Sequence, residues 1–162
     1  MQTNKPIKHV AIVALYDSKK RILLQNRANM PGGGWGFFGG RIEPEETKQE
    51  ALIREIQEKL EYPLTNYTYL GEYKNVIEER LVIRELFIAP LNTSLNELTL
   101  REGAGMNLFS IKEAKQLPLI TGDEQGIQLI EEYFSNQTNS PDPAASQDPY
   151  QRPPQRDDES NQ

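Results

Sequence analysis

Two carboxylates and an ammonium group stand close together near the middle of the chain, at Glu55, Glu58 and Lys59. Residues three or four positions apart are neighbours on a helix surface, so Glu55 and Glu58 could share one cation. Mg²⁺ prefers hard oxygen ligands and usually combines one or two carboxylates with the phosphate oxygens of a ligand. If the segment is a helix, the spacing predicts a divalent-ion site for a phosphate chain.

The segment carries the signals of an amphipathic helix. Thr47 begins a capping box, and Pro63 blocks extension much beyond Leu60. The core-facing positions of such a helix are Leu52, Ile53, Ile56 and Leu60. The three charged residues lie along the edge of that apolar stripe. A solvated face is the plainer interpretation of a glutamate-rich helix, but the Gly39-Gly40 turn in front of it favours a site.

The rest of the chain predicts an α+β fold, with a mixed sheet packed between helices. Apolar or alternating runs predict strands over residues 9–16, 21–26, 68–76, 81–89 and 106–110, with 77–80 as a connection. Helical patterns cover residues 111–116 and 123–134. Residues 30–40 hold six glycines, so we expect turns and close backbone approach there.

Composition limits the function classes. Of the 162 residues, 1–134 suffice for one domain, whereas 135–162 are rich in Pro, Ser, Gln and Asp and predict a disordered tail. A polyproline ligand at Arg152-Pro153-Pro154 is the alternative for that tail. The net charge of −6 argues against binding to duplex nucleic acid. The chain has no cysteine, which excludes thiol chemistry. It also has no transmembrane-length apolar run and no secretory signal, so we expect a cytoplasmic protein.

The glycine turn and the helix after it resemble the Nudix hydrolase family, whose box reads G-x5-E-x7-R-E-U-x-E-E-x-G-U with U a bulky aliphatic residue. The matching residues are Gly40, Glu46, Arg54, Glu55, Ile56 and Glu58. The stretch Trp35-Gly-Phe-Phe-Gly39 in front of them is also similar to the family. The resemblance implies a Nudix-like mixed β-sheet sandwiched between α-helices (α/β/α).

The same resemblance implies an activity. The family hydrolyses a pyrophosphate bond in a nucleotide or nucleoside-diphosphate derivative, by attack of water at phosphorus with Mg²⁺ or Mn²⁺ as cofactor. Such a site implies a small-molecule, nucleotide-type partner. The sequence leaves the particular substrate and the oligomeric state open.

Residue roles follow from the resemblance position by position. Glu55 and Glu58 would bind the metal together with the Gly39 carbonyl, and Glu55 could also act as a base. Arg54 would orient these carboxylates, with Glu46 as its structural partner. A further carboxylate ligand, which the family often supplies from a late loop, could be Glu102; an ordinary loop acid is the alternative.

Substrate contacts are less constrained by the sequence. Arg27 could bind a phosphate, with a surface charge as the equal alternative. Trp35, Phe37 and Phe38 could line a pocket for a base, although core packing is expected for at least two of them. His9, the only histidine, is expected to be structural.

Lys59 is the main departure from the family box, because it replaces the second glutamate of the E-E pair. Glu61 also replaces a glycine, and Tyr62 an aliphatic residue. An ammonium at position 59 could pair with Glu55 and compete with a metal ion, or it could point to solvent. The alternative to an enzyme is therefore a degenerate domain that binds a nucleotide or a partner protein with little or no hydrolysis.

Overall fold

The computed structural model describes residues 6–28, 33–101 and 104–138. The chain divides into two units, residues 1–130 and residues 131–162. Among the described residues, the first unit holds the strands and the helices α1 and α2, together with the beginning of α3 (Asp123–Thr138). In the second unit the described part is the end of α3.

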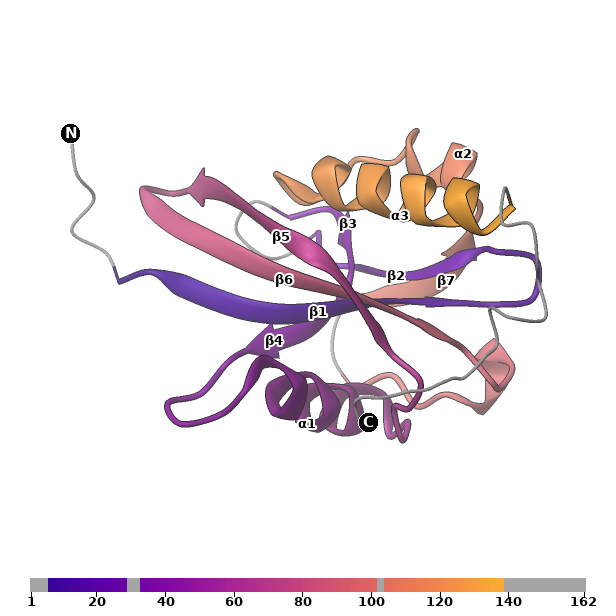
Figure 1. Cartoon of the computed structure of the whole chain (residues 1–162), viewed down its shortest axis with the longest axis horizontal. Helices are drawn as coiled ribbons and strands as arrows, with labels where there is room; N and C mark the ends of the chain where they lie inside the picture. Colours follow the sequence, from indigo (N-terminus) through magenta and orange to yellow (C-terminus); the bar gives the residue numbers. More distant parts are fainter. Residues whose placement is uncertain (1–5, 29–32, 102–103, 139–162) are drawn as a thin grey trace. The chain divides into compact units, whose positions relative to one another are not determined.

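A mixed sheet of seven strands forms the centre of the first unit (Figure 1). Its strands are β1 (Lys8–Tyr16), β2 (Ile22–Asn26), β3 (Trp35–Gly36), β4 (Phe38–Arg41), β5 (Thr68–Ile77), β6 (Arg80–Pro90) and β7 (Gly105–Phe109). β1 is central: it runs parallel to β6 on one side and antiparallel to β4 and β2 on the other. β5 and β6 form a hairpin whose two loop residues, Glu78 and Glu79, both have positive φ. That conformation matches the twist of a two-residue hairpin.

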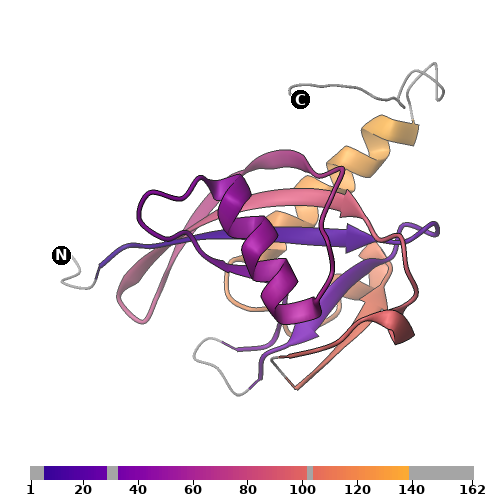
Figure 2. The same cartoon turned by 90° about the horizontal axis from the view of Figure 1, so that it is seen from below.

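Helix α1 (Lys48–Leu60) covers one face of the sheet (Figures 1 and 2). Thr47 caps its first turn, and the predicted capping box with Glu50 is present. Alternate strand residues point toward this helix. The buried cluster between the two layers includes Ala11, Val13, Leu15, Phe38, Leu52, Ile56, Leu60 and Phe87. Burial of this apolar surface holds α1, and the charged residues on its edge, against the sheet.

The opposite face of the sheet is covered by the beginning of α3 (Figure 1). Ile127 and Ile130 of this helix are buried, as their spacing predicts. A Cβ at Gly126 would lie 2.8 Å from the Phe37 ring and 2.6 Å from the Tyr73 hydroxyl, so the glycine lets α3 approach the strands closely. The smaller elements are a 3₁₀ turn at Leu95–Glu97 and α2 (Ile111–Ala114). Within the described ranges, no helix has the length and apolarity needed to cross a membrane.

The α+β prediction, with a mixed sheet between helices, is confirmed, but three details were wrong or incomplete. Residues 35–41 contain two strands where we expected only turns, because pairing with β1 and β2 supplies backbone hydrogen bonds that glycines do not signal. Ile53 is exposed rather than core-facing. α3 continues through Thr138, past the boundary predicted at Phe134, since adding residues to a formed helix is easy. Residues 139–162 of the predicted tail lie outside the described residues.

Candidate active site

Arg54 is the centre of a hydrogen-bonded group at the edge of α1. Its Nε and Nη2 donate to the two carboxylate oxygens of Glu46 over 2.7 and 2.9 Å, and Nη2 also donates to the Arg41 carbonyl over 3.0 Å. Its Nη1 donates to Glu55 Oε2 over 2.9 Å and, more weakly, to Glu58 Oε1 over 3.5 Å. The predicted catalytic residues Glu46, Arg54 and Glu55 are thus brought together, and their roles in a reaction stay a prediction.

The charges within this group stabilise one another. The hydrogen bonds from Arg54, together with one from the Glu43 backbone, lower the pKa of Glu46 to about 2. The bonds with Glu46, and then those with Glu55, raise the pKa of Arg54 further above its usual value. A two-pronged contact of this kind fixes the plane of the guanidinium. Arg54 is therefore held in an orientation that aims Nη1 at Glu55.

Two consecutive glycines of β4 allow close packing on two sides, Gly39 against β1 and Gly40 against Glu55. Gly39 pairs with Ile12 and has a φ of +155°, and a Cβ there would lie 2.1 Å from the Ala11 carbonyl oxygen. A Cβ at Gly40 would lie 2.2 Å from Cδ of Glu55. The carboxylate of Glu55 thus rests directly on the β4 backbone at Gly40, whereas Gly39 is required by the close approach of β1.

Lys59 lies on the same side of α1 and turns toward β4. Its Nζ donates to the Gly39 carbonyl and lies 3.5 Å from Glu55 Oε1. The side chains of Lys59 and Glu55 are only 13% and 12% exposed. Of the two orientations considered from sequence, the structure therefore shows the ammonium paired with Glu55 rather than directed to solvent.

The donors predicted for a divalent ion have suitable chemistry, since they are carbonyl and carboxylate oxygens. Their arrangement does not fit an ion bound between Gly39 and Glu55, because the Lys59 ammonium already bridges these two groups. Glu58 is 58% exposed and contacts Arg54 instead. A metal role for Gly39, Glu55 and Glu58 stays a prediction, and it requires Lys59 to move. Glu102 lies outside the described residues.

A cavity of about 770 Å³ opens beside this group. Its floor is the sheet face opposite the α1 core, formed by residues such as Val10, Ile12 and Val82, which alternate with the core-facing ones. Gly39, Glu55, Glu58 and Lys59 form part of its wall. The volume falls within the range of about 300–1,000 Å³ that is usual for small-molecule sites.

The cavity wall is richer in basic than in acidic side chains, although the chain as a whole carries −6. Among the described lining residues, the seven basic ones are Lys8, Arg27, Arg41, Lys59, Arg80, Arg84 and Arg101, and the five acidic ones are Glu43, Glu55, Glu58, Glu78 and Asp123. These residues come from separate strands, loops and helices, so only the fold brings them together. Apart from Arg27 and Lys59, this basic lining was missed from the sequence, where no local run of charge marks it.

A buried ionic network forms another part of the cavity lining. Nε of Arg84 lies 3.2 Å from Oδ1 of Asp123, which also accepts a 2.8 Å hydrogen bond from the Tyr73 hydroxyl. Nη2 of Arg84 donates to the Thr121 carbonyl over 3.1 Å. Burial raises the pKa of Asp123 to about 6, against the opposing effect of Arg84. This pair could not be predicted from the sequence, because its members are far apart in the chain and lack a motif.

The predicted substrate residues divide into two groups. Arg27 and the buried Phe37 line the cavity. Trp35 is absent from the described lining residues; its ring packs edge-on against Phe109, with centroids 5.0 Å apart. Phe38 is fully buried in the core under α1. Packing thus accounts for Trp35 and Phe38, whereas a contact between Phe37 and a ligand stays a prediction.

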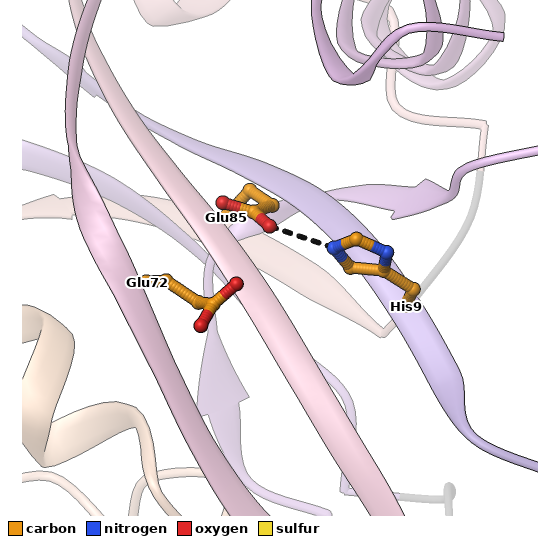
Figure 3. A group of neighbouring side chains, drawn as sticks. All are labelled: His9, Glu72 and Glu85. Atoms are coloured by element: carbon orange, nitrogen blue, oxygen red, sulfur yellow. Dashed lines mark hydrogen bonds and ion pairs between the residues drawn. The ribbon is translucent and has the colours of Figure 1, made fainter.

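His9 belongs to a separate polar group on the α1 side of the sheet, with Glu72 and Glu85 (Figure 3). Its Nε2 lies 2.7 Å from Oε2 of Glu85, and the other oxygen of Glu85 accepts a 2.7 Å hydrogen bond from Tyr69. Lys48 lies 3.5 Å from that same oxygen. Burial alone would raise the pKa of Glu85, but these partners lower it on balance. The three side chains are of metal-binding types, yet the oxygens of Glu85 are already paired, so the group fits the structural role expected for His9.

Comparison with known proteins gives a consistent result. The family model described as NUDIX domain matches residues 5–130. A CTP pyrophosphohydrolase of Escherichia coli (strain K12) is 28% identical over 126 residues, which cover 76% of this chain and 90% of that protein. An 8-oxo-dGTP diphosphatase of Proteus vulgaris is 30% identical over 98 residues, covering 59% of this chain and 86% of that protein.

A solved structure supports the fold assignment independently. The crystal structure of the MutT protein from Methanosarcina mazei Go1 superposes with a TM-score of 0.67, at 19% identity, over 85% of this chain and 99% of that one. At this identity the likeness shows the fold alone. Together with the family match over residues 5–130, which span most of the described residues, it leads to one conclusion: the chain belongs to the NUDIX domain family.

Proposed function

We propose that the cavity binds the phosphate chain of a nucleotide or nucleoside-diphosphate derivative and that the chain hydrolyses its pyrophosphate bond. In this reaction the oxygen of a water molecule bonds to phosphorus while the bond from phosphorus to the leaving oxygen breaks. The water proton passes to a base. The partner is a small nucleotide-type molecule, and a cytoplasmic location stays a prediction.

One observation carries this proposal: Gly40, Glu55 and Glu58 of the box form part of the wall of a ligand-sized cavity whose charge is opposite to that of the chain. Phosphate chains are multiply charged anions, so a site for them needs concentrated positive charge. The lining supplies it through side chains such as Arg27, Arg41 and Arg101. Phe37 also borders the cavity, although it is only 3% exposed.

Glu55 is the residue best placed to act on a bound phosphate chain. It lines the cavity, its carboxylate is held against Gly40, and Arg54 fixes one of its oxygens. In the proposed reaction Glu55 orients the attacking water and accepts its proton. Glu46 acts indirectly, because it holds the guanidinium that positions Glu55.

A second candidate function, binding of the nucleotide with little or no hydrolysis, is favoured by the position of Lys59. The predicted cofactor, Mg²⁺ or Mn²⁺, would have to displace the ammonium from both Gly39 and Glu55 before it could bind there. We therefore expect hydrolysis to be slow compared with relatives that have the full box. The names of the Escherichia coli and Proteus vulgaris relatives make CTP and 8-oxo-dGTP the first substrates to test.

A nucleotide panel tests the proposal. CTP, 8-oxo-dGTP, ADP-ribose, a dinucleoside polyphosphate and a nucleotide sugar are incubated with the protein, with Mg²⁺ and then with Mn²⁺, and phosphate and pyrophosphate release are measured. Binding of each compound is measured in parallel by calorimetry. Slow release that Glu55→Gln abolishes supports hydrolysis, and binding without release supports the second candidate. If no compound is bound or hydrolysed, the proposed function is wrong.

A further inference from the structure

The Lys59 ammonium lies where a cation is needed between two oxygen donors. It bonds to the Gly39 carbonyl and pairs with Glu55, and both charged side chains are almost nine-tenths buried. Glu55 also accepts a hydrogen bond from Arg54, so its charge is compensated from two sides. The carboxylate therefore needs no additional ion to remain in place.

We propose that Lys59 is the resident cation of this site, so that the chain binds the phosphate chain of a nucleotide without a divalent ion. This inference rests on the proposed function, since it concerns the same cavity and ligand. Lys59 replaces the ion in attracting the phosphate chain, together with the arginines that share its wall. It does not replace a metal that activates water, so binding and hydrolysis become separable properties.

The charge of the wall supports this assignment. With Lys59, the described lining has seven basic and five acidic side chains. With a glutamate at position 59, as in the family box, the same lining would have six of each. A neutral wall attracts a phosphate chain only when ions are bound to it. The single change at position 59 therefore supplies the net positive charge that a bound ion otherwise contributes.

The arginines around the cavity show the same excess of positive charge. The pKa of Lys8 is lowered, first by burial and then by repulsion from Arg27, Arg41, Arg80 and Arg84. Nε of Arg80 is, among the described residues, a buried donor without a hydrogen-bond partner. The guanidinium of Arg80, itself a lining residue, adds to the positive charge of the wall.

Isothermal titration calorimetry of the wild-type protein tests the inference directly. Pyrophosphate, CTP and cytidine are titrated in EDTA and then in Mg²⁺. We expect pyrophosphate and CTP to bind in EDTA with a Kd within about threefold of that in Mg²⁺, whereas cytidine binds much more weakly. The comparison between pyrophosphate and CTP distinguishes a general anion site from a site that also binds the nucleoside.

Matched variants assign the effect to Lys59. Lys59→Gln should weaken binding in EDTA by about tenfold or more, the usual loss for one charge-assisted hydrogen bond. Lys59→Arg should retain most of the affinity. Lys112→Gln removes an exposed charge on α2, outside the cavity lining, and should leave the binding affinity in EDTA unchanged. A melting curve for each variant confirms that it is folded.

The two proposals fail in different ways. If CTP and pyrophosphate bind in Mg²⁺ but not in EDTA, the proposed function stands and the role of Lys59 is wrong. Equal affinities in EDTA for the wild type and Lys59→Gln overturn that role as well. If neither compound nor any other nucleotide binds under either condition, the proposed function fails and this inference falls with it.

Discussion

Replacing Lys59 with glutamate should convert the site from one with its own cation to one that binds a metal ion. The distance of 3.5 Å between Nζ and Oε1 of Glu55 corresponds to about 5 kcal/mol of attraction at an effective dielectric of about 20. When the ammonium moves away from Glu55 into water, its hydration offsets part of this lost attraction. We therefore expect the displacement of Lys59 to cost about 3 kcal/mol of metal-binding free energy in the wild type, which lowers the metal affinity about a hundredfold.

Mn²⁺ binding followed by electron paramagnetic resonance measures this change without any substrate. Lys59→Glu should bind Mn²⁺ at least about a hundredfold more tightly than the wild type, because it removes the competing ammonium and adds a carboxylate. Lys59→Gln removes the ammonium alone and should fall between them. Lys112→Glu gives the same change of net charge away from the cavity and serves as the control. The reasoning is refuted if the wild type and Lys59→Glu bind Mn²⁺ equally, or if Lys112→Glu has the same effect.

Three further predictions concern the surroundings of the site. Gly40→Ala places a methyl group 2.2 Å from Cδ of Glu55, so it should displace that carboxylate and lower any hydrolysis by about a hundredfold while the melting temperature changes little; an unchanged rate would contradict the geometry. Because burial raises the pKa of Asp123 to about 6, the folded chain binds more protons there than the unfolded chain between about pH 4 and 6. Its contribution to stability should fall by up to about 3 kcal/mol as the pH rises through that window, which urea unfolding of the wild type and Asp123→Asn at pH 4 and 7 would measure; a difference that does not vary with pH would argue against it. Glu61 ends α1 in the left-handed conformation that favours glycine, so Glu61→Gly should raise the free energy of unfolding by up to about 1 kcal/mol, and a loss of stability would show that its ion pair with Arg101 matters more.

Local signals explain what could be predicted from the sequence. The capping box at Thr47 and the block at Pro63 defined α1 closely, because a few neighbouring residues determine where a helix begins and ends. The contacts among Glu46, Arg54 and Glu55 also follow from one helix and the loop before it. Alternating apolar residues revealed the longer strands, whose side chains carry the pattern.

The features that could not be predicted from the sequence depend on contacts between segments far apart in the chain. A helical wheel places Lys59 on the side of α1 next to Glu55, but the carbonyl that it meets belongs to Gly39, whose position depends on the pairing of β4 with β1. β4 itself was missed because its glycines carry no alternating pattern. The pair of Arg84 and Asp123 likewise joins β6 to α3 only after folding.

The most direct test of the central claim, that the Lys59 ammonium occupies the position of a metal ion, is anomalous diffraction from crystals soaked in MnCl₂. We expect no manganese peak between the Gly39 carbonyl and Glu55 in the wild type, and a peak there in Lys59→Glu. A manganese ion bridging Gly39 and Glu55 in the wild-type protein, with the Lys59 side chain turned away, would contradict it.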